Sequence, residues 1–136
     1  SEQGMRGAMD LALESGKVRP SDVDYVNMHG TATEIGDIAE SNATYAVFQR
    51  EVPASTQKSY LGHTLGACGA IELVYSVLMM QGGFLAANRN LDAVDPRCGK
   101  LGYVRETTAA SPRVVLSNNF AFGGVNTSIL IRKLDE

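Results

Sequence analysis

The sequence predicts a single α/β domain in which helices cover a mixed β-sheet. Two segments typical of strands are each followed by a segment typical of a helix, and two further strand segments close the chain. This alternation is characteristic of α/β proteins. The 136 residues suffice for one hydrophobic core. Leu, Ile, Val and Phe make up about a quarter of them, so a packed fold is expected.

The first half of the chain predicts a helix, a strand and a second helix. Apolar residues recur at helical spacing in residues 4–14, and Gly16 follows as an end signal. Residues 23–28 are rich in strand-forming types, which predicts a strand that ends at His29. Apolar residues return at nearly helical period in residues 37–48, which predicts the second helix.

The middle of the chain predicts a short strand over residues 54–58, then a glycine-bounded turn and a helix over residues 67–81. That helix is apolar on almost every side, and only Glu72 and Ser76 interrupt it. Such a helix is typically buried between two layers of structure.

The last third of the chain predicts mostly loop and then a strand pair. Residues 84–113 are loop-rich, with one strand expected near residues 101–105. Residues 114–117 and 126–132 predict two strands, joined by a long glycine-containing turn over residues 118–124.

Charge and cysteine content exclude several classes of function. The net charge is −3, and the Lys and Arg residues are scattered, so no nucleic-acid partner is expected. Cys68 and Cys98 have no metal-ligand spacing and form no disulfide framework, which predicts no metal site and fits the reducing cytoplasm. No apolar run of about 18 residues and no signal peptide are evident, so no membrane partner is expected.

The candidate functional residues follow the predicted strands at their carboxyl ends, where open α/β sheets bind ligands. His29 follows the first strand, and Lys58 and His63 follow the second. His63 precedes a helix N-terminus, which disfavours imidazolium and predicts a neutral ring able to donate a hydrogen bond to an oxyanion. A lone histidine there is more often structural, but two at neighbouring strand ends favour catalysis.

Two carboxylates are candidates for support of this pair. Glu72 lies inside the apolar helix and needs a partner if it is buried, and Lys58 is a candidate for that partner. Glu40 lies on the helix after His29, although an exposed helical glutamate is the simpler interpretation.

The glycine-rich turn near the C-terminus permits a moving side chain. Gly123 and Gly124 flank Phe122 and would allow it to swing at a pocket mouth. A plain turn, with Phe120 and Phe122 in the core, is the alternative. Cys68 and Cys98 have no His or acid placed by sequence to activate them, so neither is expected to be a nucleophile.

Three motifs, taken together and in this order, resemble the C-terminal part of the β-ketoacyl-acyl carrier protein synthases. They are His-Gly-Thr-Ala-Thr at residues 29–33, Lys58 followed by Gly-His-Thr-Leu-Gly-Ala-Cys-Gly-Ala at residues 62–70, and residues 118–124. They are most similar to the bacterial synthases I and II, with synthase I nearer. The resemblance implies that residues 1–136 form a thiolase-like half, the C-terminal domain of a ketoacyl synthase. It also implies that the nucleophilic cysteine belongs to an N-terminal half not in these residues.

The resemblance implies a role for each site residue. His29 and His63 are implied to hold the malonyl thioester carbonyl and to stabilise the enolate left by loss of CO₂. Lys58 is implied as the active-site lysine, with Glu72 as its partner. The implied substrate-binding residues are Thr31 and Thr33 at the pantetheine arm, and Phe122, Phe120 and Gly123 at the acyl pocket.

The implied activity is a decarboxylative Claisen condensation of acyl-enzyme with malonyl-acyl carrier protein in fatty acid biosynthesis, an acyltransferase reaction with no cofactor. The implied partners are acyl carrier protein, with its phosphopantetheine-linked acyl or malonyl group, and a second copy in a homodimer. The 136 residues alone are expected to be inactive. Some relatives hold a monovalent cation at the positions of Asn27, Glu40, Glu72, Ser117 and Asn118, although no metal site is predicted here.

Three alternatives stay open. The first is a non-catalytic partner subunit like the chain-length factors, against which the retained His29, His63 and Lys58 argue. The second is the ketosynthase domain of a polyketide synthase, from whose usual pattern Ala32 and Ile38 depart. The third is a binding module in which the surface that normally faces the first half is exposed.

Overall fold

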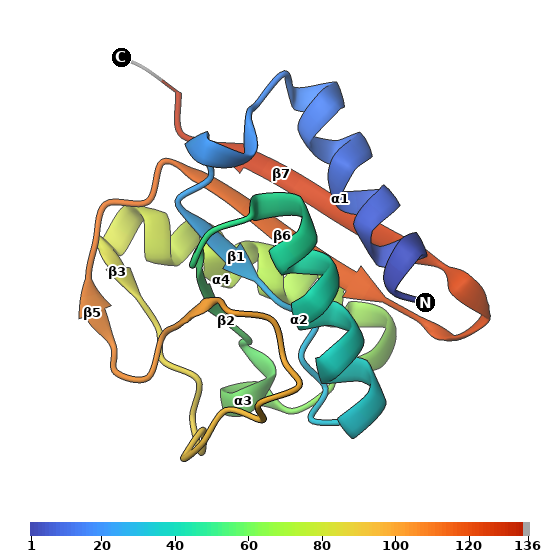
Figure 1. The fold of residues 1–136 in the computed structure, drawn as a ribbon. Coiled ribbons are helices and arrows are strands. Elements are labelled where there is room, and N and C mark those ends of the chain that lie inside the picture. Colours follow the sequence, from blue (N-terminus) through green and yellow to red (C-terminus); the bar gives the residue numbers. More distant parts are fainter. Residues whose placement is uncertain (135–136) are drawn as a thin grey trace.

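A computed structural model describes residues 1–134, so the last two residues of the predicted 1–136 domain lie outside the described part. Its main sheet has five strands in the order β4-β2-β1-β6-β7 (Figure 1). Strands β4, β2, β1 and β6 are parallel neighbours, and β7 is antiparallel to β6, which confirms the predicted mixed sheet. The strands are β1 (Tyr25–Asn27), β2 (Pro53–Ser55), β4 (Gly102–Tyr103), β6 (Val114–Phe120) and β7 (Asn126–Arg132).

Helices cover both faces of this sheet. The helices are α1 (Glu2–Gly16), α2 (Glu34–Phe48), α3 (Lys58–Leu61) and α4 (Cys68–Gly82), with 3₁₀ turns at Pro20–Asp22, Leu65–Ala67 and Phe122–Gly124. Strands β3 (Phe84–Leu85) and β5 (Thr108–Ala109) pair separately as a small antiparallel ribbon. In Figure 1, α1 and α2 lie in front of the sheet and α4 lies behind it.

The alternation of side chains along the strands builds the two sides of the core. Met9, Val26 and Leu116 belong to the buried cluster under α1 and α2. Tyr25 and Val115, one position away along the same strands, belong with Met79 to the cluster under α4. This period of two is what a sheet covered on both faces requires.

Most predicted boundaries shift by one to three residues, and two of the shifts have identifiable local causes. The strand predicted over residues 54–58 ends at Ser55, because the hydroxyl of Thr56 accepts the backbone N–H of Lys58 at 3.3 Å as the chain turns into α3. The strand predicted over residues 114–117 continues to Phe120, because its pairing with β7 runs on to that residue.

The orientation of α4 differs from the prediction of a helix buried between layers. Its buried residues are Cys68, Glu72, Ser76 and Met79, which form one stripe at helical spacing. Val74 is 57% exposed, so the apolar side of this helix points away from the sheet. The physical reason is that two residues of this stripe have polar partners on the sheet: Glu72 accepts from Asn27 of β1, and Cys68 donates to Asn119 of β6.

The expectation that the chain has no apolar run of about 18 residues is also corrected for this region. Residues 65–82 have a mean hydropathy of 1.3 and are long and apolar enough to cross a membrane by length and composition. Core helices of soluble proteins meet the same criterion, so this is weak evidence for a membrane span.

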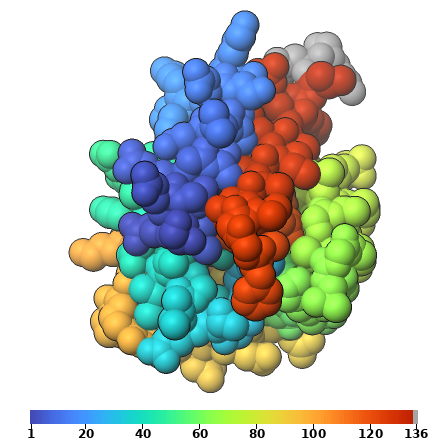
Figure 2. Space-filling model, turned by 90° about the vertical axis from the view of Figure 1, so that its right-hand side faces the viewer, coloured from blue at the N-terminus to red at the C-terminus, as the bar shows by residue number. Residues whose placement is uncertain are grey.

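Seen from the side, β7 lies between α1 and α4 (Figure 2).

Candidate active site

The carboxyl ends of neighbouring strands bring three predicted residues together. His29 lies two residues past the end of β1, and Lys58 and His63 follow β2, its parallel neighbour. The ring centroids of His29 and His63 lie 5.4 Å apart with their planes at 86°. Phe120, at the end of β6, places its ring centroid 6.1 Å from that of His29. The structure therefore assembles one site from three strand ends.

A backbone hydrogen bond determines the tautomer of His63. Its Nδ1 accepts the N–H of Leu65 at 3.0 Å, so the proton of the neutral ring is on Nε2. The turn that provides this N–H holds Leu65 at φ 52°, in the left-handed region that side chains rarely adopt. The neutral ring is thus a hydrogen-bond donor through Nε2.

His29 is held as a neutral donor by its surroundings. Its Nδ1 lies 3.3 Å from Nζ of Lys58, and an ammonium can only donate, so the ring proton is on Nε2. Burial first, and then the positive charge of Lys58, lower the pKa of His29 to about 4. At neutral pH the site therefore presents two uncharged imidazoles, each with an Nε2–H.

A buried ion pair holds Lys58. Its Nζ donates to Oε1 of Glu72 at 2.5 Å, and both side chains are at most 5% exposed. The other carboxylate oxygen of Glu72 accepts from Nδ2 of Asn27 at 3.0 Å, and that amide also donates to Oγ of Ser117 at 3.1 Å. Lys58 is thus the partner that Glu72 needs as a buried carboxylate in an apolar helix.

Glu40 anchors the loop that carries His29. It is buried, and its two oxygens accept the backbone N–H groups of His29 at 2.7 Å and Gly30 at 2.8 Å. Burial raises the pKa of Glu40 to about 7, against the effect of these two bonds. The simpler interpretation of an exposed helical glutamate is therefore wrong. Gly30 is required here, because its φ is 42° and a Cβ would lie 2.7 Å from Cβ of Thr56.

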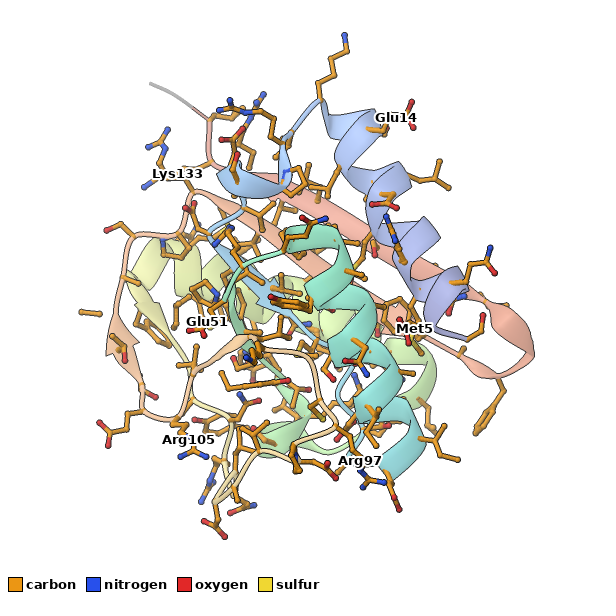
Figure 3. The ribbon with its side chains drawn as sticks, in the orientation of Figure 1. Met5, Glu14, Glu51, Arg97, Arg105 and Lys133 are labelled. Atoms are coloured by element: carbon orange, nitrogen blue, oxygen red, sulfur yellow. The ribbon has the colours of Figure 1, made fainter. Side chains whose placement is uncertain are left out.

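Thr31 lines a cavity, and the hydroxyl of Thr33 lies next to that of Thr31. Oγ1 of Thr31 and Oγ1 of Thr33 are 3.2 Å apart, and Thr31 lines a cavity of about 830 Å³ together with Lys58 and His63. The outer wall of this cavity includes Arg97, whose guanidinium pairs with Glu34 at the start of α2 at 2.8 Å (Figure 3).

The two phenylalanines of the last motif lie in different environments. Phe120 is buried and faces His29, whereas Phe122 is fully exposed. Gly123 and Gly124 follow with φ of 79° and 81°, a conformation that favours glycine. The alternative that places both rings in the core is wrong for Phe122.

Three of the five positions that hold a cation in some relatives are joined by hydrogen bonds, and the other two have separate hydrogen-bond partners. Asn27, Glu72 and Ser117 lie together under α4, and Oδ1 of Asn27 is buried with no hydrogen-bond partner. Both oxygens of Glu40 bind backbone N–H groups, and Oδ1 of Asn118 accepts from Ser128 at 2.6 Å. Within residues 1–134, no group of three or more His, Cys, Asp or Glu is placed to hold a metal ion.

Sequence reasoning missed Asn119. Its Oδ1 accepts from the thiol of Cys68 at 2.9 Å, which links the end of β6 to the first turn of α4. The alternation of side chains along a strand could have identified it, because a strand that continues to Phe120 puts Asn119 on the same face as Ser117.

The fold and the site together define an α/β domain with a pair of neutral imidazoles at the end of its sheet, a site suited to negative charge on oxygen. The family description "Beta-ketoacyl synthase, C-terminal domain" matches residues 1–92. The chain belongs to the β-ketoacyl synthase family.

Individual relatives agree with this assignment. The 3-oxoacyl-[acyl-carrier-protein] synthase 1 of Escherichia coli is 43% identical over 115 residues, 84% of this chain and 28% of that protein. A β-ketoacyl synthase crystal structure from Burkholderia phymatum has a TM-score of 0.96 at 48% identity, over 99% of this chain and 33% of that one. The ketosynthase complex AntDE:AntF has a TM-score of 0.92 at 30% identity, over 99% of this chain and 34% of that one. The chain thus spans about a third of the length of these relatives.

Proposed function

We propose that the parent protein of this chain is a 3-oxoacyl-acyl carrier protein synthase, which joins an enzyme-bound acyl group to a decarboxylated malonyl unit on acyl carrier protein. Residues 1–136 are its C-terminal thiolase-like half, and an N-terminal half supplies the nucleophilic cysteine. The observation that carries this proposal is the pair of neutral rings, His29 and His63, 5.4 Å apart, beside the buried Lys58–Glu72 pair.

The geometry accounts for the carbon–carbon step. The bond between the malonyl carboxylate and its α-carbon breaks, CO₂ leaves, and the electron pair forms an enolate with negative charge on the thioester oxygen. The Nε2–H groups of His29 and His63 donate to that oxygen. The enolate carbon then attacks the acyl thioester, and the cysteine thiolate leaves. One such preorganised donor is worth about 3–4 kcal/mol in the transition state.

Lys58 supports this chemistry by keeping His29 in the donating form. Its ammonium lies at Nδ1 of His29, where it both fixes the tautomer and disfavours a second proton on the ring. Glu72 neutralises the buried ammonium, so the charge is tolerated away from water.

The substrate arm and partners are assigned on the same basis. The hydroxyl of Thr31 at the cavity and that of Thr33 beside it are suited to hydrogen bonds with the pantetheine of acyl carrier protein. Exposed Phe122, with Gly123 as a hinge, gates the acyl pocket beside Phe120. The AntDE:AntF structure contains an acyl-carrier protein bound to its ketosynthase, which supports this class of partner.

The proposal also includes the oligomeric state and the cellular location of the parent protein. The parent protein forms a homodimer, which light scattering of the full-length protein tests directly. It acts in the cytoplasm, in keeping with Cys68 and Cys98, which are unpaired in this structure.

The deciding experiment measures CO₂ release from malonyl-acyl carrier protein by the full-length protein. His29→Ala and His63→Ala are each expected to lower kcat about 100-fold or more, because each removes one donor to the enolate oxygen. Asp10→Ala, at an exposed position on α1, is the control and should retain full activity. Unchanged turnover in both histidine variants would overturn the proposal.

Identity favours the fatty-acid reaction over the polyketide alternative. The named ketosynthase and chain length factor relatives are 29–32% identical, against 43% for the Escherichia coli synthase. A full-length protein without a reactive cysteine and without decarboxylase activity would instead indicate a partner subunit.

A further inference from the structure

Thr56 is a side chain between two loops of the site that the mechanism above does not use. Where β1 and β2 end, the N–H of Met28 donates to the carbonyl of Ser55 at 2.9 Å. Past this backbone bond, the hydroxyl of Thr56 lies 3.4 Å from the carbonyl oxygen of His29 and 3.3 Å from that of Gly30. A side chain thus continues the connection between the two strands into the site.

The hydroxyl of Thr56 serves both loops through one oxygen atom. A hydroxyl has one proton to donate and two lone pairs that accept. Its proton is shared between the carbonyls of His29 and Gly30, and its oxygen accepts the backbone N–H of Lys58 at 3.3 Å. The packing is equally close, because a Cβ at Gly30 would lie 2.7 Å from Cβ of Thr56. The backbones of His29 and Lys58 are therefore joined at a single atom.

The carboxamide of Asn88 holds Thr56 from the other side of β2. Its Oδ1 accepts the N–H of Thr56 at 2.9 Å, and its Nδ2 donates to the carbonyls of Ala54 at 3.1 Å and Val104 at 3.3 Å. These partners determine which way the carboxamide faces, since an N–H requires its oxygen and the carbonyls require its nitrogen. Val104 follows β4, the other neighbour of β2. Thr56 is therefore tied to the chain on both sides of β2.

We propose that Thr56 is a positioning residue, which together with Asn88 sets the distance between Lys58 and His29. The ammonium of Lys58 is held by Glu72 at 2.5 Å, so the remaining variable is where the imidazole of His29 lies against it. The hydroxyl of Thr56 ties the two backbones together and thereby keeps Nδ1 of His29 3.3 Å from Nζ of Lys58. The link to turnover rests on the proposed function, whereas the hydrogen bonds themselves do not.

Loss of this hydroxyl should lower kcat with little change in KM. Without it, the two loops have fewer contacts, and the ammonium of Lys58 no longer faces Nδ1 of His29 at a fixed distance. The Nε2–H of that ring is then less well aligned with the enolate oxygen. The hydroxyls proposed to bind pantetheine, on Thr31 and Thr33, are not among these contacts, so substrate binding should change little.

The test compares Thr56→Val with Thr56→Ser in the full-length protein labelled with ¹⁵N-histidine. Valine keeps the shape of threonine and removes the hydroxyl, whereas serine keeps the hydroxyl. The signals of His29 are assigned by their absence from His29→Gln. The Nδ1 resonance of His29 at neutral pH reports the contact with Lys58, which a merely structural role for Thr56 would leave in place.

Thr108→Val is the matched control for this substitution. The hydroxyl of Thr108 is exposed and also donates to a backbone carbonyl, that of Glu106 at 2.8 Å. It lies in the β3–β5 ribbon, apart from the main sheet that carries the site. Its removal should therefore leave both the resonance and the activity unchanged.

The three variants should separate clearly. Thr56→Val is expected to shift the Nδ1 resonance of His29 and to lower kcat about 10-fold, with KM for malonyl-acyl carrier protein within about 2-fold. Thr56→Ser and Thr108→Val should keep the wild-type resonance and a kcat within about 2-fold of wild type. Asn88→Leu, which removes the anchor of Thr56, should shift the resonance in the same direction as Thr56→Val.

An unchanged resonance or a wild-type kcat in Thr56→Val would overturn the inference. An equal effect of Thr56→Ser would do the same, because shape rather than the hydroxyl would then be responsible. If Thr56→Val does not fold, Asn88→Leu decides in its place by the same two measurements. Failure of the proposed function is distinguishable, because His29→Ala and His63→Ala would then retain CO₂ release while the Nδ1 resonance still reports on Thr56.

Discussion

At the scale of single residues, the site consists of groups that are costly to bury alone. Lys58 and Glu72 are both withdrawn from water, and each charge is compensated by the other. The buried carboxylate of Glu40 likewise accepts hydrogen bonds from two backbone N–H groups in place of water. The result is a rigid frame around His29 in which loss of one partner leaves another group unsatisfied.

The Lys58–Glu72 pair gives a stability prediction. Glu72→Gln should destabilise the fold by about 3–5 kcal/mol, because it leaves the ammonium of Lys58 buried without a counter-charge. The double variant Lys58→Met, Glu72→Leu should recover most of that loss while remaining inactive. Urea unfolding measures both. A double variant as unstable as Glu72→Gln alone would contradict this explanation.

The pKa of His29 gives a prediction for pH dependence. It is about 4 in the folded protein against an ordinary 6.5, so the unfolded chain binds more protons between these values. Stability from this group is therefore present above pH 6.5 and is lost as the pH falls toward 4. His29→Gln should show a shallower loss over that window in urea unfolding at several pH values. An unchanged pH profile in that variant would contradict the assignment.

At the scale of elements, two glycines of α1 differ in the space that a side chain would find at each position. Gly7 lies in the interior of the helix, and a Cβ there would meet no other atom within 4 Å. Gly16 ends the same helix, and a Cβ there would come within 2.3 Å of the Leu130 side chain.

This contrast gives a paired prediction. Gly7→Ala should stabilise the fold by about 0.5–1 kcal/mol, because alanine loses less conformational entropy in a helix. Gly16→Ala should not stabilise, because Leu130 must move from its packed position. Thermal unfolding of both variants compares them directly. Equal stabilisation by the two would mean that the contact with Leu130 has no energetic effect.

At the scale of the whole molecule, the two sides of the sheet are unequally covered. Helices α1 and α2 cover one side, whereas α4 is alone on the other and turns its own apolar face outward. Exposed apolar side chains on this helix and on the edge strand β7 include Val74, Leu78 and Ile129. Exposed apolar side chains gathered on one helix are typical of an interface.

This surface predicts that the 136-residue chain self-associates when it is expressed alone. Val74→Glu together with Leu78→Glu should shift it toward monomer in sedimentation velocity, since charges oppose burial of that face. Leu11→Glu is the control, because Leu11 is similarly exposed but lies on α1. A monomeric wild-type chain at the same concentration would contradict this prediction.

The sequence by itself determined the order of the longer helices and of the strands of the main sheet, the mixed sheet, and the convergence of His29, Lys58 and His63, but not helix α3 or the β3–β5 ribbon. These follow from local periodicity and from one rule, that parallel neighbours end at the same edge of a sheet. Strand ends were less predictable, because Ser55 and Phe120 are set by a side-chain hydrogen bond and by pairing with a distant strand.

Only the tertiary structure decided which way α4 faces, that Phe122 is exposed, and that Asn119 contacts Cys68. The apolar composition of α4 predicts a buried helix, but it does not predict which side meets the sheet. That side is set by polar residues of the sheet, Asn27 and Ser117. The tautomers were decided in the same way, since each depends on one hydrogen bond, from Leu65 or from Lys58, that forms only when the chain is folded. Short-range pattern thus determines where the elements are, and long-range polar pairing determines how the site works.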